Sequence, residues 1–391
     1  MFLILLVILV ALVFTYINGF HDTANSIATV VSTKVLTPRQ AVGLAAVTNL
    51  IGAFFGTAVA ATIASGLVDA QVATMPVLCC ALVAAIVWSL LTWWFGLPSS
   101  SSHALVGGLC GAVLAASGDR WSAIIWSVPG KEHWWQGKGV LWKVIVPMIS
   151  SPLVGFVVGF LLMGLLYFLL QNWRPVTVNR VFGRLQLLSA SYMGFAHGTN
   201  DAQKTMGIIT LALVVATKAG LLISAPQWLS WLQTPEGTPA GHLSPVAWLI
   251  MHLPTWLQFG YQPPTIDPKS QFIPAWITIL CALTMCAGTA AGGWRIIRTL
   301  GHKMVRIHPV HGFAAEATGA SVLFTAAHFG MPVSTTHAIT ASIMGVGCAK
   351  SLNALKLVVV ERILWAWVLT LPASGVIAYA LARIARAANW L

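Results

Sequence analysis

The chain has 391 residues, of which 58% are hydrophobic and only 8% are charged, whereas soluble domains carry about 25% charged residues. This composition excludes a soluble globular protein and indicates an integral membrane protein. The formal net charge of +12 does not indicate nucleic-acid binding, because most lysines and arginines lie in connections between apolar segments, where they set membrane orientation.

A transmembrane helix needs about 20 apolar residues, and the chain contains two successive sets of such segments. The first set comprises 1–33, 41–65, 72–96, 99–118 and 143–171. The second set comprises 186–217, 272–294, 311–330, 336–350 and 357–381. We therefore predict an all-α membrane protein with about 10–12 transmembrane or re-entrant helices. The segments 99–118 and 336–350 are short enough to be re-entrant half-helices.

Basic clusters predict the membrane orientation. Arginines gather in 172–185 and again in 295–306, and short loops rich in Lys and Arg face the cytoplasm. The stretch 219–271 is rich in Trp and Pro and has one lysine, so we predict an external insertion. The N-terminal apolar run has no basic n-region and is predicted to be the first span rather than a cleaved signal peptide.

Two similar motifs place an aspartate inside apolar sequence. Gly-Phe-His-Asp-Thr-Ala-Asn-Ser spans 19–26 and contains Asp22, and Gly-Thr-Asn-Asp-Ala-Gln-Lys-Thr spans 198–205 and contains Asp201. A carboxylate at the centre of a membrane costs about 2.5–3.5 kcal/mol on insertion scales. Two such costs at matching positions indicate functional groups rather than hydrogen-bonding contacts between helices.

A second pair of motifs supports an internal duplication. Gly-Leu-Pro-Ser-Ser-Ser-Ser-His-Ala (96–104) matches Gly-Met-Pro-Val-Ser-Thr-Thr-His-Ala (330–338). One insertion, about the length of 219–271, accounts for the different spacing between the motifs in the two halves. Five crossings in each half make the second half run opposite to the first, and inverted repeats are typical of transporters. The predicted division is a first repeat 1–171, a cytoplasmic linker 172–185 and a second repeat 186–391.

The aspartates belong to polar stripes at helical spacing. Asn18, Asp22, Asn25 and Thr29 lie on one helix face, and His197, Asp201 and Lys204 form the matching stripe. The glycines at 19, 194 and 198 predict helix breaks, which are tolerated in a membrane where the freed backbone lines a cavity. Lys204 pairs with Asp201 or contacts an anion, and the sequence leaves both alternatives open.

The proline and hydroxyl clusters predict helix N-termini. Such ends present backbone N–H groups and a partial positive charge, which favours anion binding, and the hydroxyls at 99–102 and 334–336 add neutral donors. His103 and His337 follow these clusters as donors to the anion or as helix-packing residues.

An oxyanion at these helix ends would be repelled by the aspartates. Two like charges about 4 Å apart at an effective dielectric near 20 repel by about 4 kcal/mol, so a bound cation or protonation must accompany the anion. We therefore expect cation-coupled transport. Glu316 is a third intramembrane acid, which binds the coupling ion or pairs with a base such as Arg306 or His311.

Together these four placed motifs and Gly-Phe-Ala-Ala-Glu (312–316) resemble the inorganic phosphate transporter (PiT) family over nearly the whole chain. Tyr-Ile-Asn-Gly-Phe-His-Asp-Thr-Ala-Asn (16–25) is similar to its bacterial low-affinity branch. The resemblance implies a phosphate:cation symporter of the bacterial inner membrane, with an inverted-repeat fold and a homodimeric assembly.

The resemblance also implies the site residues. Phosphate would be bound by Asn25, Asn200, Ser101, Ser102, Thr335 and Thr336. The coupling cation would be bound by Asp22 and Asp201, which are also candidate metal ligands, and Glu316 matches a functionally important acid of the family.

His21 and Asn49 depart from the pattern of many members of the family. They favour protons over sodium as the coupling cation, with a metal–phosphate complex as a further candidate substrate. Sodium coupling, and a permease for sulfate or another oxyanion on the same fold, stay as alternatives. A channel and a membrane-embedded enzyme fit the sequence less well. Broken helices favour alternating access over a continuous pore, and no Ser/His/Asp spacing or HExxH-type metal motif is present.

Overall fold

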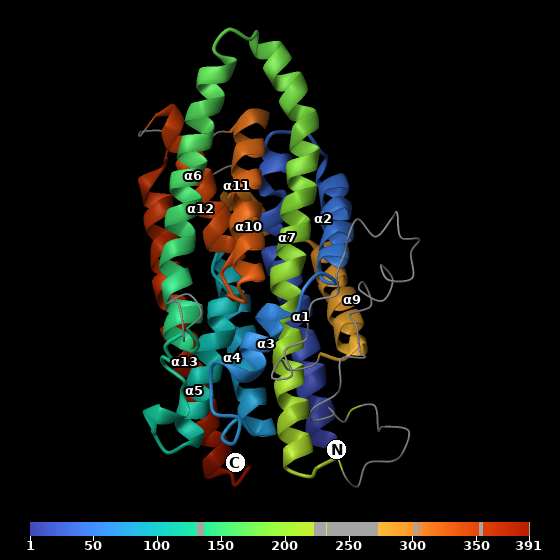
Figure 1. The fold of residues 1–391 in the computed structure, drawn as a ribbon, viewed down its shortest axis with the longest axis vertical. Coiled ribbons are helices and arrows are strands. Elements are labelled where there is room, and N and C mark those ends of the chain that lie inside the picture. The colour runs from blue at the N-terminus through green and yellow to red at the C-terminus, as the bar shows by residue number, and fades with distance from the viewer. Residues whose placement is uncertain are drawn as a thin grey trace.

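Helices make up most of the chain that the computed structural model describes, namely residues 1–130, 137–222, 232, 273–300, 304–305, 307–351 and 355–390. These residues contain no strand, and their only β-type pairings are two isolated bridges. The prediction of an all-α protein is confirmed. Figure 1 shows the helices as one elongated bundle with both termini at the same end and the α6–α7 connection at the other.

Apart from the predicted segment 41–65, the helices of the first half follow the predicted segments closely. They are α1 (Phe2–Ser32), α2 (Pro38–Gly52), α3 (Ala58–Ser65), α4 (Met75–Phe95), α5 (Ser101–Ala116) and α6 (Val146–Leu170), the last preceded by the π-helical turn η3 (Leu141–Ile145). A short 3-10 turn, η1 (Trp121–Ala123), follows α5.

The remaining described helices belong to the second half of the chain. Its helices are α7 (Pro175–Lys218), α9 (Ala275–Ala291), α10 (Trp294–Arg298), α11 (Pro309–His328), α12 (Thr335–Lys350) and α13 (Leu357–Ala387). The predicted insertion 219–271 lies almost entirely outside the described residues. Only residues 171–174 separate α6 from α7, so residues 175–185 of the predicted linker are helical. Pro175 suits the first helical position, and the exposed arginines that follow keep this part of the helix in water.

The prediction of one continuous span over 41–65 is wrong, because the chain leaves the helix between α2 and α3. Gly56 has a φ of +85° there, a conformation that other residues adopt only with strain. In the second half, Gly292 (φ +72°) separates α9 from α10 in the same way.

The predicted helix breaks at glycines 19, 194 and 198 are also wrong, because α1 and α7 continue through them. These glycines allow other helices to approach closely. A Cβ at Gly19 would lie 2.6 Å from the carbonyl oxygen of Met285, and one at Gly198 would lie 2.2 Å from that of Asn49.

The two short helices α5 and α12 begin inside the protein. Ser100 and Ser334 cap them, each accepting a hydrogen bond from the backbone N–H three residues later at 3.1 Å, and the residues around both caps are buried. Each helix pairs with the preceding one, so that α4–α5 and α11–α12 form two helical hairpins. This arrangement agrees with the predicted re-entrant character of 99–118 and 336–350.

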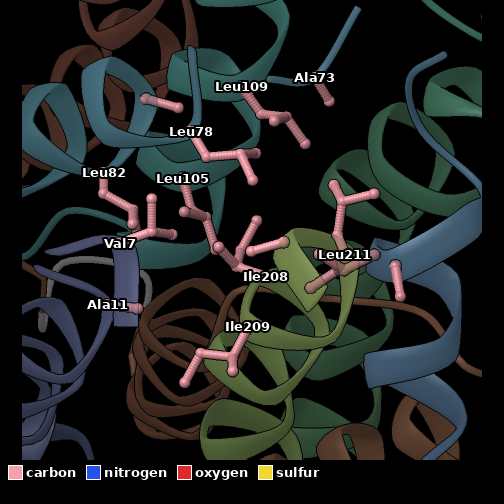
Figure 2. Close-up of a cluster of buried hydrophobic side chains, with 14 of the residues drawn as sticks. Val7, Ala11, Ala73, Leu78, Leu82, Leu105, Leu109, Ile208, Ile209 and Leu211 are labelled. Carbon is pink, nitrogen blue, oxygen red and sulfur yellow. The ribbon is translucent and has the colours of Figure 1, made fainter. Parts of the chain in front are cut away.

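Helices of the first half pack against helices of the second half. α1 packs against α9 while α2 packs against α7, and α5 packs against α13 while α12 packs against α6. Figure 2 shows part of the resulting apolar core, in which Val7 of α1, Leu78 of α4, Leu105 of α5 and Ile208 of α7 converge.

The outer helices carry the apolar surface that a bilayer requires. Among the described residues, four helices are long and apolar enough to cross a membrane: Phe2–Ser32, Met75–Phe95, Leu141–Leu170 and Leu357–Ala387. α6 exposes large side chains such as Leu153, Leu161 and Phe168 along its length. Because such a surface would be unfavourable in water, it faces lipid.

Replacing Gly198 by alanine should destabilise the protein, because the added methyl group would overlap the backbone of α2. Overpacking of this kind costs about 1–3 kcal/mol. The matched control is Gly43→Ala in α2, where a Cβ would meet nothing within 4 Å and should be neutral or stabilising. Thermal unfolding of the purified protein in detergent measures both. Equal transition temperatures for the two variants would contradict the close α2–α7 packing.

Candidate functional site

A cluster of polar side chains is buried where the middles of α1 and α7 meet the N-termini of α5 and α12. The predicted site residues Asp22, Asn25, Asn200, Asp201, Ser101, Ser102, Thr335 and Thr336 are each 2% exposed or less. The structure thus brings together residues from all four sequence motifs. Because every member is buried, each polar atom must find a partner in the protein or in a ligand.

Asp22 receives donors from three elements. Ser101 of α5 donates to its Oδ2 at 2.6 Å, and Thr336 of α12 donates to its Oδ1 at 3.3 Å. His21 lies beside it, with Nδ1 at 2.8 Å from Oδ1. The carboxylate on α1 therefore joins both short helices.

Asp201, on α7, has hydroxyl contacts similar to those of Asp22 and, in addition, a cationic neighbour. The Nζ atom of Lys204 donates to both Asp201 Oδ1 and Ser102 Oγ, and Thr335 donates to Asp201 Oδ2 at 3.4 Å. Of the two alternatives for Lys204, the structure shows the ion pair with Asp201. Two carboxylates and one ammonium leave a formal charge of −1 in the cluster.

Asn25 connects the two aspartates. Its Nδ2 donates to Thr335 Oγ1 at 3.1 Å and to Thr336 Oγ1 at 2.9 Å, and these hydroxyls in turn donate to Asp201 and Asp22. The amide oxygens of Asn25 and Asn200 have no hydrogen-bond partner. Two buried acceptors without donors are suited to a cation.

His197 lies beside Asp201 with its own orientation fixed by α2. Its Nδ1 is 3.0 Å from Asn49 Oδ1, and Asn49 Nδ2 donates to Thr289. Because the Asn49 amide oxygen faces the ring and can only accept a hydrogen bond, the proton of the neutral His197 imidazole lies on Nδ1. The opposite nitrogen, Nε2, then carries a lone pair and lies 3.3 Å from Asp201 Oδ2. Two facing lone pairs require a proton or a metal cation at that point.

Asp22, His197 and Asp201 together could hold a metal ion, since each offers one ligand atom and these atoms lie within 4.8 Å of one another. That separation suits a cation held about 2.3–2.6 Å from each ligand. The sequence predicted Asp22 and Asp201 for this role but not His197. The only indication of this role in the sequence was the position of His197 in the polar stripe, one helical turn before Asp201.

The four predicted hydroxyls at 99–102 divide into different roles. Ser101 and Ser102 face Asp22 and Lys204, whereas Ser99 donates to Thr92 at 2.7 Å and Ser100 caps the helix. His103 and His337 pack ring against ring, with centroids 4.8 Å apart. His337 also stacks on Trp367 at 4.0 Å, so both histidines contribute to packing between the hairpins.

Glu316 forms a separate cluster. Its Oε1 accepts from Thr29 at 2.5 Å and from Gln186 at 3.0 Å, and its Oε2 accepts from Ser189. Thr29 is two turns beyond Asp22 on α1, which is about 10 Å along the helix. None of the contacts of Glu316 in the described structure is with Asp22 or Asp201. Gln186 and Ser189 were not predicted, although they continue the polar stripe of α7.

The predicted pairing of Glu316 with a base is wrong for His311, which contacts Tyr167 Oη at 2.8 Å and the backbone N–H of His308. The other candidate base, Arg306, lies outside the described residues. Among the described residues, the hydrogen-bond partners of the Glu316 carboxyl group are three neutral donors, Thr29, Gln186 and Ser189. Like Asp22, this buried acid has no lysine or arginine among its described partners.

Comparison with known proteins identifies the family. The model of the phosphate transporter family matches residues 18–378. The chain belongs to the phosphate transporter family. Because this is a family of transporters, membership agrees with the prediction that the protein is not an enzyme. The bacterial relatives and the apolar helices make it an integral protein of the bacterial inner membrane.

Curated relatives match over almost the whole chain. A probable low-affinity inorganic phosphate transporter of Mycobacterium tuberculosis (strain ATCC 25618 / H37Rv) is 41% identical over 377 residues, covering 96% of this chain and 76% of the relative. The protein of the same description in Bacillus subtilis (strain 168) is 39% identical over 382 residues, covering 96% of both. That of Rhizobium meliloti (strain 1021) is 40% identical over 371 residues, covering 95% and 92%.

A solved structure described as "The sodium-dependent phosphate transporter" has a similar fold. It aligns with a TM-score of 0.74 and covers 99% of this chain and 100% of that one, at 21% sequence identity. At this identity the likeness shows the fold, which agrees with the helical membrane architecture described above.

Removing the amine of Lys204 should destabilise the protein through Asp201. The variant Lys204→Met leaves the carboxylate buried without its ion-pair partner, and breaking a buried pair in this way costs about 3–5 kcal/mol. Adding Asp201→Asn to it removes the unpaired charge and should recover most of the loss. Thermal unfolding in detergent compares the single and double variants. A double variant no more stable than Lys204→Met would contradict the ion pair.

Proposed function

We propose that this protein is a phosphate symporter that couples phosphate uptake to a cation and works by alternating access. The observation that carries the proposal is the single buried cluster in which two carboxylates and two hydroxyl-bearing helix N-termini share their hydrogen bonds. Membership of the phosphate transporter family supports phosphate as the anion.

The cluster suggests how cation and anion binding are linked. The hydroxyls of Ser101, Thr335 and Thr336 donate to carboxylates, and Ser102 accepts from Lys204. A cation bound between Asp22 and Asp201 would replace those hydroxyl donors. The hydroxyls could then rotate and donate to phosphate, together with the amides of Asn25 and Asn200 and the N-terminal backbone N–H groups of α5 and α12 that the caps do not use.

This transfer of hydroxyl donors from the carboxylates to phosphate disfavours the binding of either ion alone. Phosphate without the cation would take donors from the carboxylates and add negative charge beside them. The cation without phosphate would leave the hydroxyl protons facing a positive charge. Each ion therefore favours binding of the other. This mutual effect corresponds to a coupling free energy between the two ions, which symport requires.

We favour the proton as the coupling cation. An imidazole stands beside each carboxylate, His21 next to Asp22 and His197 next to Asp201, and an imidazole nitrogen can either donate or accept a proton. Sodium is the second candidate. The ligand set of Asp22, His197 and Asp201 and the description of the similar structure as sodium-dependent support it.

Alternating access is supported by the exchanged packing of the two halves. The pairs α1–α9 and α2–α7, and α5–α13 and α12–α6, are the pattern expected of two inverted repeats, with 1–171 and 186–391 as the units. Transporters of this kind bind substrate at the interface of the repeats. The proposed substrate is inorganic phosphate, free or complexed with a divalent metal, and Glu316 is proposed as a further cation-coupling residue.

Uptake of radiolabelled phosphate into proteoliposomes tests the proposed function. An imposed inward proton gradient should drive phosphate above its equilibrium level, and an inward sodium gradient alone should drive less. Stronger inhibition by sulfate than by arsenate would indicate another oxyanion permease instead. Uptake that ignored both gradients would contradict symport.

Removing a hydroxyl from the site should weaken phosphate binding. In Ser102→Ala, the KM for phosphate should rise about tenfold or more, because a hydrogen bond to a charged group is worth about 1.5–3 kcal/mol. Ser99→Ala is the matched control, since Ser99 donates to Thr92 and contacts neither aspartate. The proteoliposome assay measures both. If the two variants had equal KM values, Ser102 would not contact phosphate.

A further inference from the structure

The tips of the two hairpins have the same backbone geometry. Gly96 (φ +65°) directly follows the end of α4, and Gly330 (φ +63°) lies two residues beyond the end of α11. Past each glycine the next N–H returns to the helix, from Leu97 to the Thr92 carbonyl and from Met331 to the Ala326 carbonyl, both at 2.9 Å. This arrangement satisfies some of the carbonyls at the helix end but leaves the carbonyl of each glycine for another partner.

In both tips that partner is a threonine from the other half of the chain, either on a short helix or directly after one. Thr299 donates to the Gly96 carbonyl at 2.8 Å, and Thr62 of α3 donates to the Gly330 carbonyl at 2.7 Å. Thr299 directly follows α10. The first-half hairpin is thus held by a second-half segment, and the second-half hairpin by a first-half helix.

A cationic side chain accompanies each threonine. Arg295 donates to the Trp94 carbonyl at 2.7 Å and lies over the rings of Trp93 and Trp94, and Lys143 donates to the Phe329 carbonyl at 3.0 Å. Cations are favoured at helix C-termini. Each tip therefore has the same two contacts, one hydroxyl and one cation, from elements outside its own hairpin.

The two contacts lie at different heights of the bundle. In Figure 1, α3 is nearer the end with the termini than α10 is. Each held glycine is five residues before a site hydroxyl, Gly96 before Ser101 and Gly330 before Thr335. Movement of a tip must therefore move one side of the site.

We propose that Thr62 and Thr299 are positioning residues that hold two gates closed, one at each end of the bundle. The inference rests on the proposed alternating-access function. Both hydrogen bonds are formed here, and the site between them is buried, as expected of an occluded state. Release of the Thr62 contact opens the site toward the end with the termini, and release of the Thr299 contact opens it toward the opposite end.

Hydrogen–deuterium exchange of the full-length protein in lipid nanodiscs tests this inference. Thr62→Val keeps the shape of the side chain and removes the donor. It should speed amide exchange of 331–334 by about fivefold, as expected for loss of one hydrogen bond, and leave 97–100 unchanged. Thr299→Val should do the reverse. General destabilisation would instead speed exchange at both tips.

Two controls make the result specific. Ser65→Ala removes a hydroxyl that bonds only within α3, to the Ala61 carbonyl, and should change neither tip. Thr62→Ser keeps the donor and should exchange like the wild type. Equal changes at both tips, or none in either valine variant, would overturn the inference. Failure of the wild type to take up phosphate would overturn the proposed function, while the exchange pattern would still report on the gates.

Discussion

Two carboxylates buried in the centre of a membrane protein are the constraint on which this structure depends. Asp22 and Asp201 must each be compensated, because an unpaired charge in such surroundings is too costly to persist. The protein supplies hydroxyls from two helix N-termini and one ammonium, which still leaves a formal charge of −1. Because the negative charge is not fully compensated, the cluster attracts a cation.

The need to bring donors to the carboxylates explains much of the architecture. The hydroxyls that reach Asp22 and Asp201 lie at the starts of α5 and α12, so both helices must begin in the interior. A helix that begins there needs a cap and a hairpin partner, which Ser100 with α4 and Ser334 with α11 provide. The close approach of α1 to α9 and of α2 to α7 at glycines closes the bundle around the cluster.

The sequence predicted most of the helices, and it identified residues that the structure gathers in one buried cluster, because both depend on local patterns. Apolar length indicated the spans, and repeated motifs identified Asp22, Asp201 and the hydroxyls at 101–102 and 335–336. The role of Gly19 and Gly198 was mistaken, since a glycine in a helix can mark either a break or a close contact, and only the neighbouring helix decides. The separate location of Glu316 and the contact of Lys204 depend on three-dimensional packing, which spacing along one chain does not encode.

We propose that a cation at Asp22 releases the hydroxyls that bind phosphate. Calorimetric titration of phosphate at several concentrations of the coupling cation, first the proton and then sodium, tests it most directly. In the wild type the affinity for phosphate should rise with cation concentration. In Asp22→Asn, which removes the charge at nearly constant size, the slope of log affinity against log cation concentration should fall by about one, as linkage requires for the loss of one cation site. An unchanged slope in this variant would contradict the account.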